Sequence, residues 1–203
     1  MDAAQRTDEW FKARLGKATA SRFNDVIART RSGYSSARAN YRAQLVIERL
    51  TKEKAESYTN SYMQWGIDNE PIAQMAYEAE TGNEVIEAEF VDHDLLMAGA
   101  SPDGYVGDDG LVEIKCPASA THIETLKKRK IPNQYMAQVQ GQMWITGRFW
   151  CDFVSFDPRL PSNAQLFIVR VERDDDYINT LEEEVADFLA EVDEEVAFIK
   201  SFK

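Results

Sequence analysis

Hydrophobic residues recur at helical spacing through the first eighty residues of the chain. Thr19-Ala20-Ser21 is typical of a helix start, and the apolar residues after it are spaced three and four positions apart. A loop at Ser32-Gly33 follows. The pattern then predicts two more helices, over about residues 37–54 and 68–82. The N-terminal part of the chain is therefore predicted to be helical.

From Glu84 onward the pattern becomes strand-like. Three short apolar segments bounded by Gly and Asp turns predict strands over residues 85–91, 95–100 and 111–115. Later segments predict helices over 119–130, 133–146 and 174–200, and strands over 149–156 and 165–171. These elements predict one α/β (α+β) unit in which helices flank a central mixed sheet.

Composition narrows the class of protein. A chain of 203 residues with 44% hydrophobic and 29% charged residues fits a single soluble globular domain. Cys116 and Cys151 lack CxxC spacing, which argues against a disulfide framework and a structural zinc site. Two histidines are too few for a multi-histidine metal centre. The apolar stretches are too short to span a membrane and the N-terminus is too polar for a signal peptide, so we expect a reduced cytosolic protein.

The net charge of −12 is unevenly distributed. Residues 10–54 contain eleven Lys and Arg against three acids, whereas residues 172–195 contain twelve acids against one Arg. Both segments can be read as solvated helix faces. Alternatively, the basic segment follows a phosphate backbone while the acidic segment is held away from it.

The most informative segment runs from Ser101-Pro102-Asp103-Gly104 to Lys115. Side chains alternate along a strand, so Glu113 and Lys115 are predicted to point the same way. Residues 107–110 suit a turn that folds the second strand back beside Asp103. Two carboxylates and one ammonium group would then converge, unless the hairpin carries only a surface ion pair.

Such a cluster suits phosphodiester hydrolysis. Carboxylates can hold Mg²⁺, which neutralises phosphate oxygens, stabilises the leaving group and acidifies water. Lys115 could orient or deprotonate the attacking water, and we expect neighbouring cations to draw its pKa below the usual ~10.4.

Three further segments carry candidate residues. Glu70 is predicted in the first turn of a helix, where it could also simply complement the helix dipole. Gln138 and Gln142 lie one helical turn apart and could hold a phosphate or water, or be idle surface residues. Arg14, near Thr19 and Ser21, could clamp an anion or form a structural salt bridge.

The order of these motifs resembles that of the lambda-exonuclease and YqaJ-like viral recombinase family, in the PD-(D/E)xK nuclease superfamily. The matching motifs are R-x-G-x-x-T-A-S, W-G-x-x-x-E, S-P-D-G, E-I-K-C-P and Y-M-A-Q-V-Q. The resemblance implies a restriction-endonuclease-like core over residues 61–171. A basic helical part (1–60) would precede it and an acidic helix (172–203) would follow it, within one domain.

The resemblance also assigns roles to individual residues. It implies metal ligation by Asp103, Glu113, Glu70 and the Ile114 carbonyl, with Lys115 as the catalytic lysine and Gln138 beside it. It implies a 5′-phosphate pocket formed by Arg14, Ser21, Ser101 and Gln138. Arg31 matches an arginine that enters the DNA minor groove, and Met63 matches an apolar wedge that separates terminal base pairs.

By this resemblance the protein is a Mg²⁺-dependent 5′-to-3′ exonuclease acting on double-stranded DNA ends. Two Mg²⁺ ions would occupy each active site, with Mn²⁺ able to replace them. The enzyme would release 5′-mononucleotides and leave a 3′ single strand for a phage single-strand annealing protein. We expect a homotrimeric ring in the cytoplasm of a bacterial host, encoded by a phage or prophage. A ring would explain the charge distribution if basic segments faced its channel and the acidic helix faced solvent.

Two alternatives remain open at this point. One is a non-processive PD-(D/E)xK endonuclease or a single-strand-specific nuclease. The other is a catalytically inactive DNA-binding scaffold for recombination, which the presence of all three residues Asp103, Glu113 and Lys115 disfavours.

Overall fold

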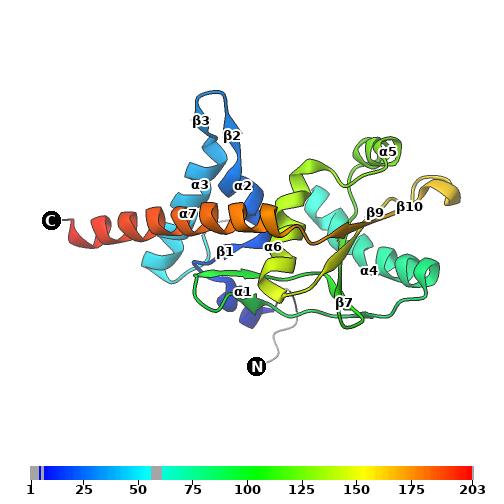
Figure 1. The fold of residues 1–203 in the computed structure, drawn as a ribbon, viewed down its shortest axis with the longest axis horizontal. Coiled ribbons are helices and arrows are strands. Elements are labelled where there is room, and N and C mark those ends of the chain that lie inside the picture. The colour runs from blue at the N-terminus through cyan, green and yellow to red at the C-terminus, as the bar shows by residue number, and fades with distance from the viewer. Residues whose placement is uncertain (1–4, 6, 56–60, 203) are drawn as a thin grey trace.

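The computed structural model describes residues 5, 7–55 and 61–202. The expectations for residues 1–4 and for the boundary at residue 60 fall outside the described residues. Figure 1 shows α6 near the middle of the molecule, with α2, α3 and most of α7 on one side and the sheet with α4 and α5 on the other.

A five-stranded mixed sheet forms one half of the molecule, in the order β10-β9-β8-β7-β4. β8 and β9 are parallel, and the other neighbouring strands are antiparallel. The strands are β4 (Val85–Ile86), β7 (Gly104–Val106), β8 (Gly110–Lys115), β9 (Trp150–Phe156) and β10 (Leu166–Glu172). This confirms the predicted central mixed sheet.

Helices surround this sheet and build the other half. They are α1 (Asp8–Arg14), α2 (Phe23–Ile27), α3 (Ser36–Thr51), α4 (Ser61–Thr81), α5 (Ser119–Lys128), α6 (Met136–Thr146) and α7 (Asp175–Ser201), with short 3₁₀ turns at η1 (Ala20–Arg22), η2 (Asn133–Tyr135) and η3 (Ser162–Ala164). No helix in the described part of the chain is long and apolar enough to cross a membrane.

The two faces of the sheet are covered by different helices. Val112 and Ile114 of β8 belong to the buried cluster that includes Tyr77 of α4. Leu111 of β8 packs instead with Met143 of α6. Because side chains alternate along a strand, Glu113 shares the face of Leu111 and points toward α6.

The strands predicted over residues 85–91 and 95–100 each form only in part. The segment predicted over 85–91 divides between two sheets, since β4 joins the central one. β5 (Val91–Asp92) joins β6 (Ala98–Ala100) and β1 (Ala18–Thr19) in a smaller sheet. Between them the Ala88 carbonyl accepts a hydrogen bond from the Gln5 side chain at 3.3 Å. The Ala88 carbonyl is thus satisfied by a side chain that is distant in the sequence and not by a neighbouring strand.

α4 is longer than the pattern predicts. It begins at Ser61 rather than near residue 68 and contains Pro71. The guanidinium of Arg159 lies over the Trp65 ring, 4.1 Å from its centroid, a long-range contact that supports the early turns. Glu70 therefore lies inside the helix and not in its first turn, so a role in complementing the helix dipole does not apply.

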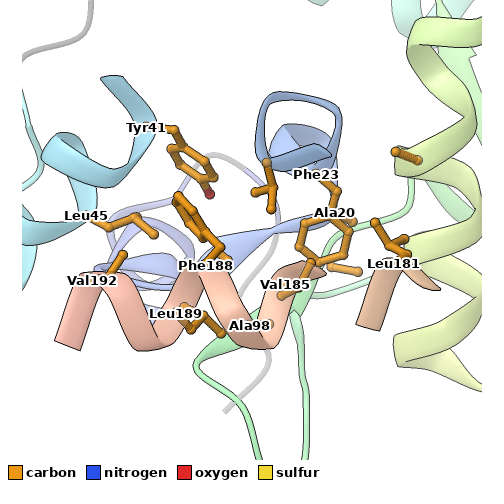
Figure 2. Close-up of a cluster of buried hydrophobic side chains, with 14 of the residues drawn as sticks. Ala20, Phe23, Tyr41, Leu45, Ala98, Leu181, Val185, Phe188, Leu189 and Val192 are labelled. Carbon is orange, nitrogen blue, oxygen red and sulfur yellow. The ribbon is translucent and has the colours of Figure 1, made fainter. Parts of the chain in front are cut away.

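α7 packs on α2 and α3 through the predicted apolar stripe. Figure 2 shows Val185, Phe188 and Val192 of α7 directed toward α2 and α3. The Phe188 ring stacks on Tyr41 of α3, with centroids 5.4 Å apart. The stripe explains why this acidic helix docks on the body of the protein.

The acidic helix also pairs directly with the basic segment. The ion pairs are Arg29–Glu184 (2.5 Å), Arg38–Glu184 (3.7 Å), Arg38–Glu191 (2.7 Å), Arg42–Glu191 (2.7 Å), Arg42–Glu195 (2.9 Å) and Arg49–Asp193 (2.6 Å). The acidic segment is therefore held against part of the basic segment. Four of the eleven basic residues are neutralised by α7, because the apolar contact places α7 against α3.

Candidate active site

The predicted hairpin brings Asp103, Glu113 and Lys115 together. Asp103 precedes β7, which pairs antiparallel with β8 in the register Gly104–Val112. Asp103 Oδ2 accepts a hydrogen bond of 2.6 Å from the backbone N–H of Ile114. Lys115 Nζ donates to Glu113 Oε1, so both side chains lie on the same face of β8.

Two glutamines of α6 hold the Glu113 carboxylate. Gln138 Nε2 donates to Oε1 at 2.5 Å, and Gln142 Nε2 donates to Oε2 at 2.6 Å. Glu113 is only 1% exposed, so these donors replace the water that a carboxylate needs. The predicted pair of glutamines is therefore not idle on the surface. The sequence suggested a phosphate or water as their target, and the structure adds Glu113.

The site holds more negative than positive charge. Burial raises the pKa of Asp103, and Glu113 and Glu70 raise it further, while Lys115 opposes them. Burial also raises the pKa of Cys116 to about 12, with further contributions from Glu70 and Asp103. Three carboxylates thus act on one another around a single lysine. A bound cation would relieve this repulsion.

The side chains around Lys115 act against the expected lowering of its pKa. Burial favours the neutral amine, but the carboxylates of Glu113 and Asp103 outweigh burial and raise the pKa. Any lowering would have to come from bound cations. The protein itself keeps Lys115 charged and directed at Glu113.

The oxygen-rich donor set fits a hard divalent cation. Mg²⁺ is commonly bound through one or two carboxylates and keeps several waters. Asp103 and Glu113 could provide those carboxylates, and the Ile114 carbonyl and Glu70 stay predicted ligands. Within residues 5, 7–55 and 61–202, no group of three or more His, Cys, Asp or Glu side chains could by itself enclose a metal. Both cysteines, Cys116 and Cys151, are free, as the sequence predicts.

Two adjoining pockets meet at this site. One, of about 540 Å³ and here named the carboxylate pocket, is lined by Lys115, Gln138 and Glu70. The other, of about 290 Å³, is lined by Arg14 among others. Ser21 and Met63 line both pockets, so the two pockets adjoin at these residues.

Arg14 is held by Trp10 of its own helix and by Ser101 in the loop between β6 and β7. Its Nη1 donates to Ser101 Oγ at 3.1 Å, and its guanidinium lies 4.0 Å from the centre of the Trp10 ring. Trp10 Nε1 donates to the same Ser101 oxygen at 2.9 Å. Burial lowers the pKa of Arg14 to about 10, with Tyr41 opposing the shift. A half-buried cation that lines a pocket is suited to binding an anion.

The predicted 5′-phosphate residues thus fall into two groups. Arg14 and Ser101 are in contact, and Ser21 lines the same pocket as Arg14. Gln138 lies in the neighbouring pocket, bonded to Glu113. Sequence reasoning missed Trp10, whose only signal is a tryptophan in an otherwise polar segment.

Arg31 and Met63, the two residues predicted to contact DNA, lie in different parts of the structure. Arg31 lies at the tip of the hairpin of β2 (Arg29–Thr30) and β3 (Gly33–Tyr34), which projects from the body in Figure 1. Its side chain is exposed, and it lines neither pocket of the site. Met63 is 51% exposed in the first turn of α4, at the boundary between the two pockets.

The sequence of this chain matches a known protein family. The model of the YqaJ-like viral recombinase domain matches residues 9–149, more than half of the chain. The chain belongs to this family. The match includes Asp103, Glu113, Lys115 and both glutamines, whereas α7 lies beyond it.

Solved structures of related proteins have the same fold as this chain. An alkaline exonuclease from Laribacter hongkongensis, LHK-Exo, is 49% identical over 96% of both chains, with a TM-score of 0.89. A structure of LHK-Exo in complex with dAMP has the same identity and coverage, with a TM-score of 0.90. The fold therefore matches alkaline exonucleases of the PD-(D/E)xK type.

More distant relatives extend the comparison. A phage-related exonuclease from Haemophilus somnus 129PT is 19% identical over 90% of this chain and 96% of its own, with a TM-score of 0.73, and shares the fold. The uncharacterized protein ExoD of Escherichia coli (strain K12) is 36% identical over 69 residues, which cover 34% of this chain and 78% of ExoD. The family and the LHK-Exo structures support a nuclease role in recombination.

Proposed function

We propose that this protein is a Mg²⁺-dependent 5′-to-3′ exonuclease that digests one strand of double-stranded DNA from its ends. The observation that carries the proposal is that the carboxylate pocket and the pocket of Arg14 adjoin at Ser21 and Met63, which line both. An enzyme that begins at an end must recognise the terminal 5′-phosphate while it cuts the next phosphodiester. Two adjoining sites, one for each phosphate, meet that requirement.

Each residue then has a definable task. Water attacks the phosphorus after the first nucleotide, and the bond from that phosphorus to the 3′-oxygen breaks. The terminal residue leaves as a 5′-mononucleotide, and the shortened strand has a new 5′-phosphate. Lys115 would orient the attacking water and Arg14 would hold the terminal phosphate. The dAMP bound by LHK-Exo is a mononucleotide of the kind that this cut would release.

The metal would be held by Asp103 and Glu113, assisted by the Ile114 carbonyl and Glu70. When bound there, Mg²⁺ or a substituting Mn²⁺ would supply Lewis-acid stabilisation of the phosphoryl charge. Gln138 and Gln142 would keep the Glu113 carboxylate oriented.

The wider assembly is proposed on the resemblance alone. We propose a homotrimeric ring and delivery of the 3′ single strand to a phage single-strand annealing protein, in the cytoplasm of a bacterial host. The charge distribution no longer favours a ring, because α7 pairs with α3. Arg31 at the tip of its hairpin would reach the minor groove, and Met63 would separate the terminal base pairs.

The deciding experiment uses linear duplexes in which one end carries a 5′-phosphate. With Mg²⁺, we expect digestion from the phosphorylated end, release of mononucleotides and a remaining complementary strand. EDTA should stop digestion, and a covalently closed plasmid should stay intact. Asp103→Asn and Lys115→Ala should each reduce the rate by at least about 10²–10⁴-fold.

Other outcomes would favour the alternatives. Cutting of the closed plasmid would indicate an endonuclease, and digestion of single strands alone would indicate a single-strand-specific enzyme. DNA binding without cleavage in any metal would indicate an inactive scaffold.

A further inference from the structure

Four consecutive basic residues, 127–130, lie at and just beyond the C-terminal end of α5, in a chain of net charge −12. Lys127 is paired with Glu124 at 3.0 Å. Lys128 and Lys130 form no ion pair with any other described residue, and both are exposed. Lysines near the end of a helix favourably offset its dipole, but Lys130 lies beyond the helix, which ends at Lys128. The helix dipole therefore does not explain Lys130.

Lys128 and Lys130 line a cavity of about 380 Å³, here named the basic pocket. Asn133 and Gln134 of η2 and Thr121 of α5 also line it. The side-chain amides of Asn133 and Gln134 make no hydrogen bond to other described residues. Lys, Thr, Asn and Gln are side chains that commonly contact the phosphates and sugars of DNA. The one acid in the lining, Glu124, is already paired with Lys127.

The basic pocket lies next to the candidate active site along the chain. Gln134 lines the basic pocket, and the next residue, Tyr135, lines the carboxylate pocket with its ring 5.4 Å from Lys115 Nζ. Gln138, which contacts Glu113, lies four positions after Gln134. Four residues span at most about 14 Å. A DNA strand rises ~3.4 Å per nucleotide along the helix axis, so this distance corresponds to about four nucleotides.

We infer that the basic pocket binds a backbone phosphate of the DNA substrate within about four nucleotides of the bond that is cut. Lys128 and Lys130 supply the charge, and Asn133 and Gln134 supply neutral hydrogen-bond donors. The inference rests on the proposed function and adds a second phosphate site to it. This site would hold the substrate in register without taking part in chemistry.

The test measures binding of the full chain to a 5′-phosphorylated duplex in EDTA, by fluorescence anisotropy over a range of KCl concentrations. The variant is Lys128→Ala/Lys130→Ala. The control, Lys200→Glu, makes the same change in net charge at the exposed end of α7, at the opposite end of the molecule from α5 in Figure 1. Each lost phosphate contact should flatten the slope of log affinity against log salt by about 0.9. The double variant should show this flattening, and Lys200→Glu should not.

A second arm locates the phosphate. Neutral methylphosphonate linkages are placed one at a time along the duplex. A linkage within about four nucleotides of the first scissile bond should flatten the wild-type slope and have no further effect on the double variant. Equal slopes for the double variant and Lys200→Glu, at unchanged thermal unfolding midpoints, would overturn the inference. The inference would also be overturned if every linkage flattened the slope of the double variant by as much as it flattens that of the wild type. Failure of the wild type to digest the duplex with Mg²⁺ would refute the proposed function instead.

Discussion

Replacing Gln142 with leucine should separate metal affinity from stability. Gln142 Nε2 donates to Glu113 Oε2 at 2.6 Å, and its own Oε1 is buried without a hydrogen-bond partner. The leucine variant loses a hydrogen bond to a charged group, worth about 1.5–3 kcal/mol. It also removes the unsatisfied Oε1, whose burial costs about 1–3 kcal/mol. The middle values of the two ranges nearly cancel, and their extremes bound the change in the free energy of unfolding at about 2 kcal/mol in either direction.

The affinity for the metal, unlike the stability, should fall strongly in the Gln142→Leu variant. Partners that orient a metal ligand typically account for about 10–100-fold in affinity. We expect Gln142→Leu to weaken Mn²⁺ binding by that factor in titration calorimetry, with little change in thermal midpoint.

Gln140, on the same helix, is the matched control. Its side chain donates to the Glu172 carbonyl at 2.8 Å and accepts from the Asp174 N–H at 3.0 Å, away from Glu113. Gln140→Leu loses two hydrogen bonds and should cost about 2 kcal/mol. That corresponds to about 4–8 °C in a domain of this size, with unchanged Mn²⁺ affinity. Unchanged Mn²⁺ affinity in Gln142→Leu would refute this role of Gln142. Equal losses of affinity in both variants would show that the effect is not specific to Glu113.

Two further predictions concern Arg14 and the acidic helix. Arg14→Ala should slow digestion of 5′-phosphorylated duplexes by about 10- to 150-fold, the equivalent of a charged hydrogen bond of about 1.5–3 kcal/mol, and should barely affect 5′-hydroxyl duplexes. A variant that keeps the full preference for phosphorylated ends would contradict the pocket assignment. Burial opposes ionisation of Glu191, but hydrogen bonds from Arg38 and Arg42 outweigh it and lower its pKa below the usual 4.5. A lowered pKa stabilises the fold above pH 4.5 and loses that contribution as the pH falls further. The stability advantage of the wild type over Glu191→Gln, measured by urea unfolding, should therefore shrink below pH 4.5, and a difference independent of pH would count against this pairing.

Local pattern was sufficient to predict most of the elements and the convergence of Asp103, Glu113 and Lys115. Alternation along a strand places Glu113 and Lys115 on one face, and the Gly and Asp residues at 107–110 make the turn that returns beside Asp103. The helical apolar stripe of residues 174–200 predicted α7 because it depends only on neighbouring turns. Such features are determined by residues close together in the chain.

Contacts between distant residues decided the rest. The early turns of α4 are supported by Arg159, and the segment between β4 and β5 is held by Gln5. The basic and acidic segments are paired because the apolar face of α7 packs on α3. The pKa of Lys115 is raised because Glu113 and Asp103 both lie close to it. By itself the sequence determined which chemical groups are present and which local faces they share. Only the tertiary structure decided their partners, because electrostatic and packing energies depend on distances between residues that lie far apart in the chain.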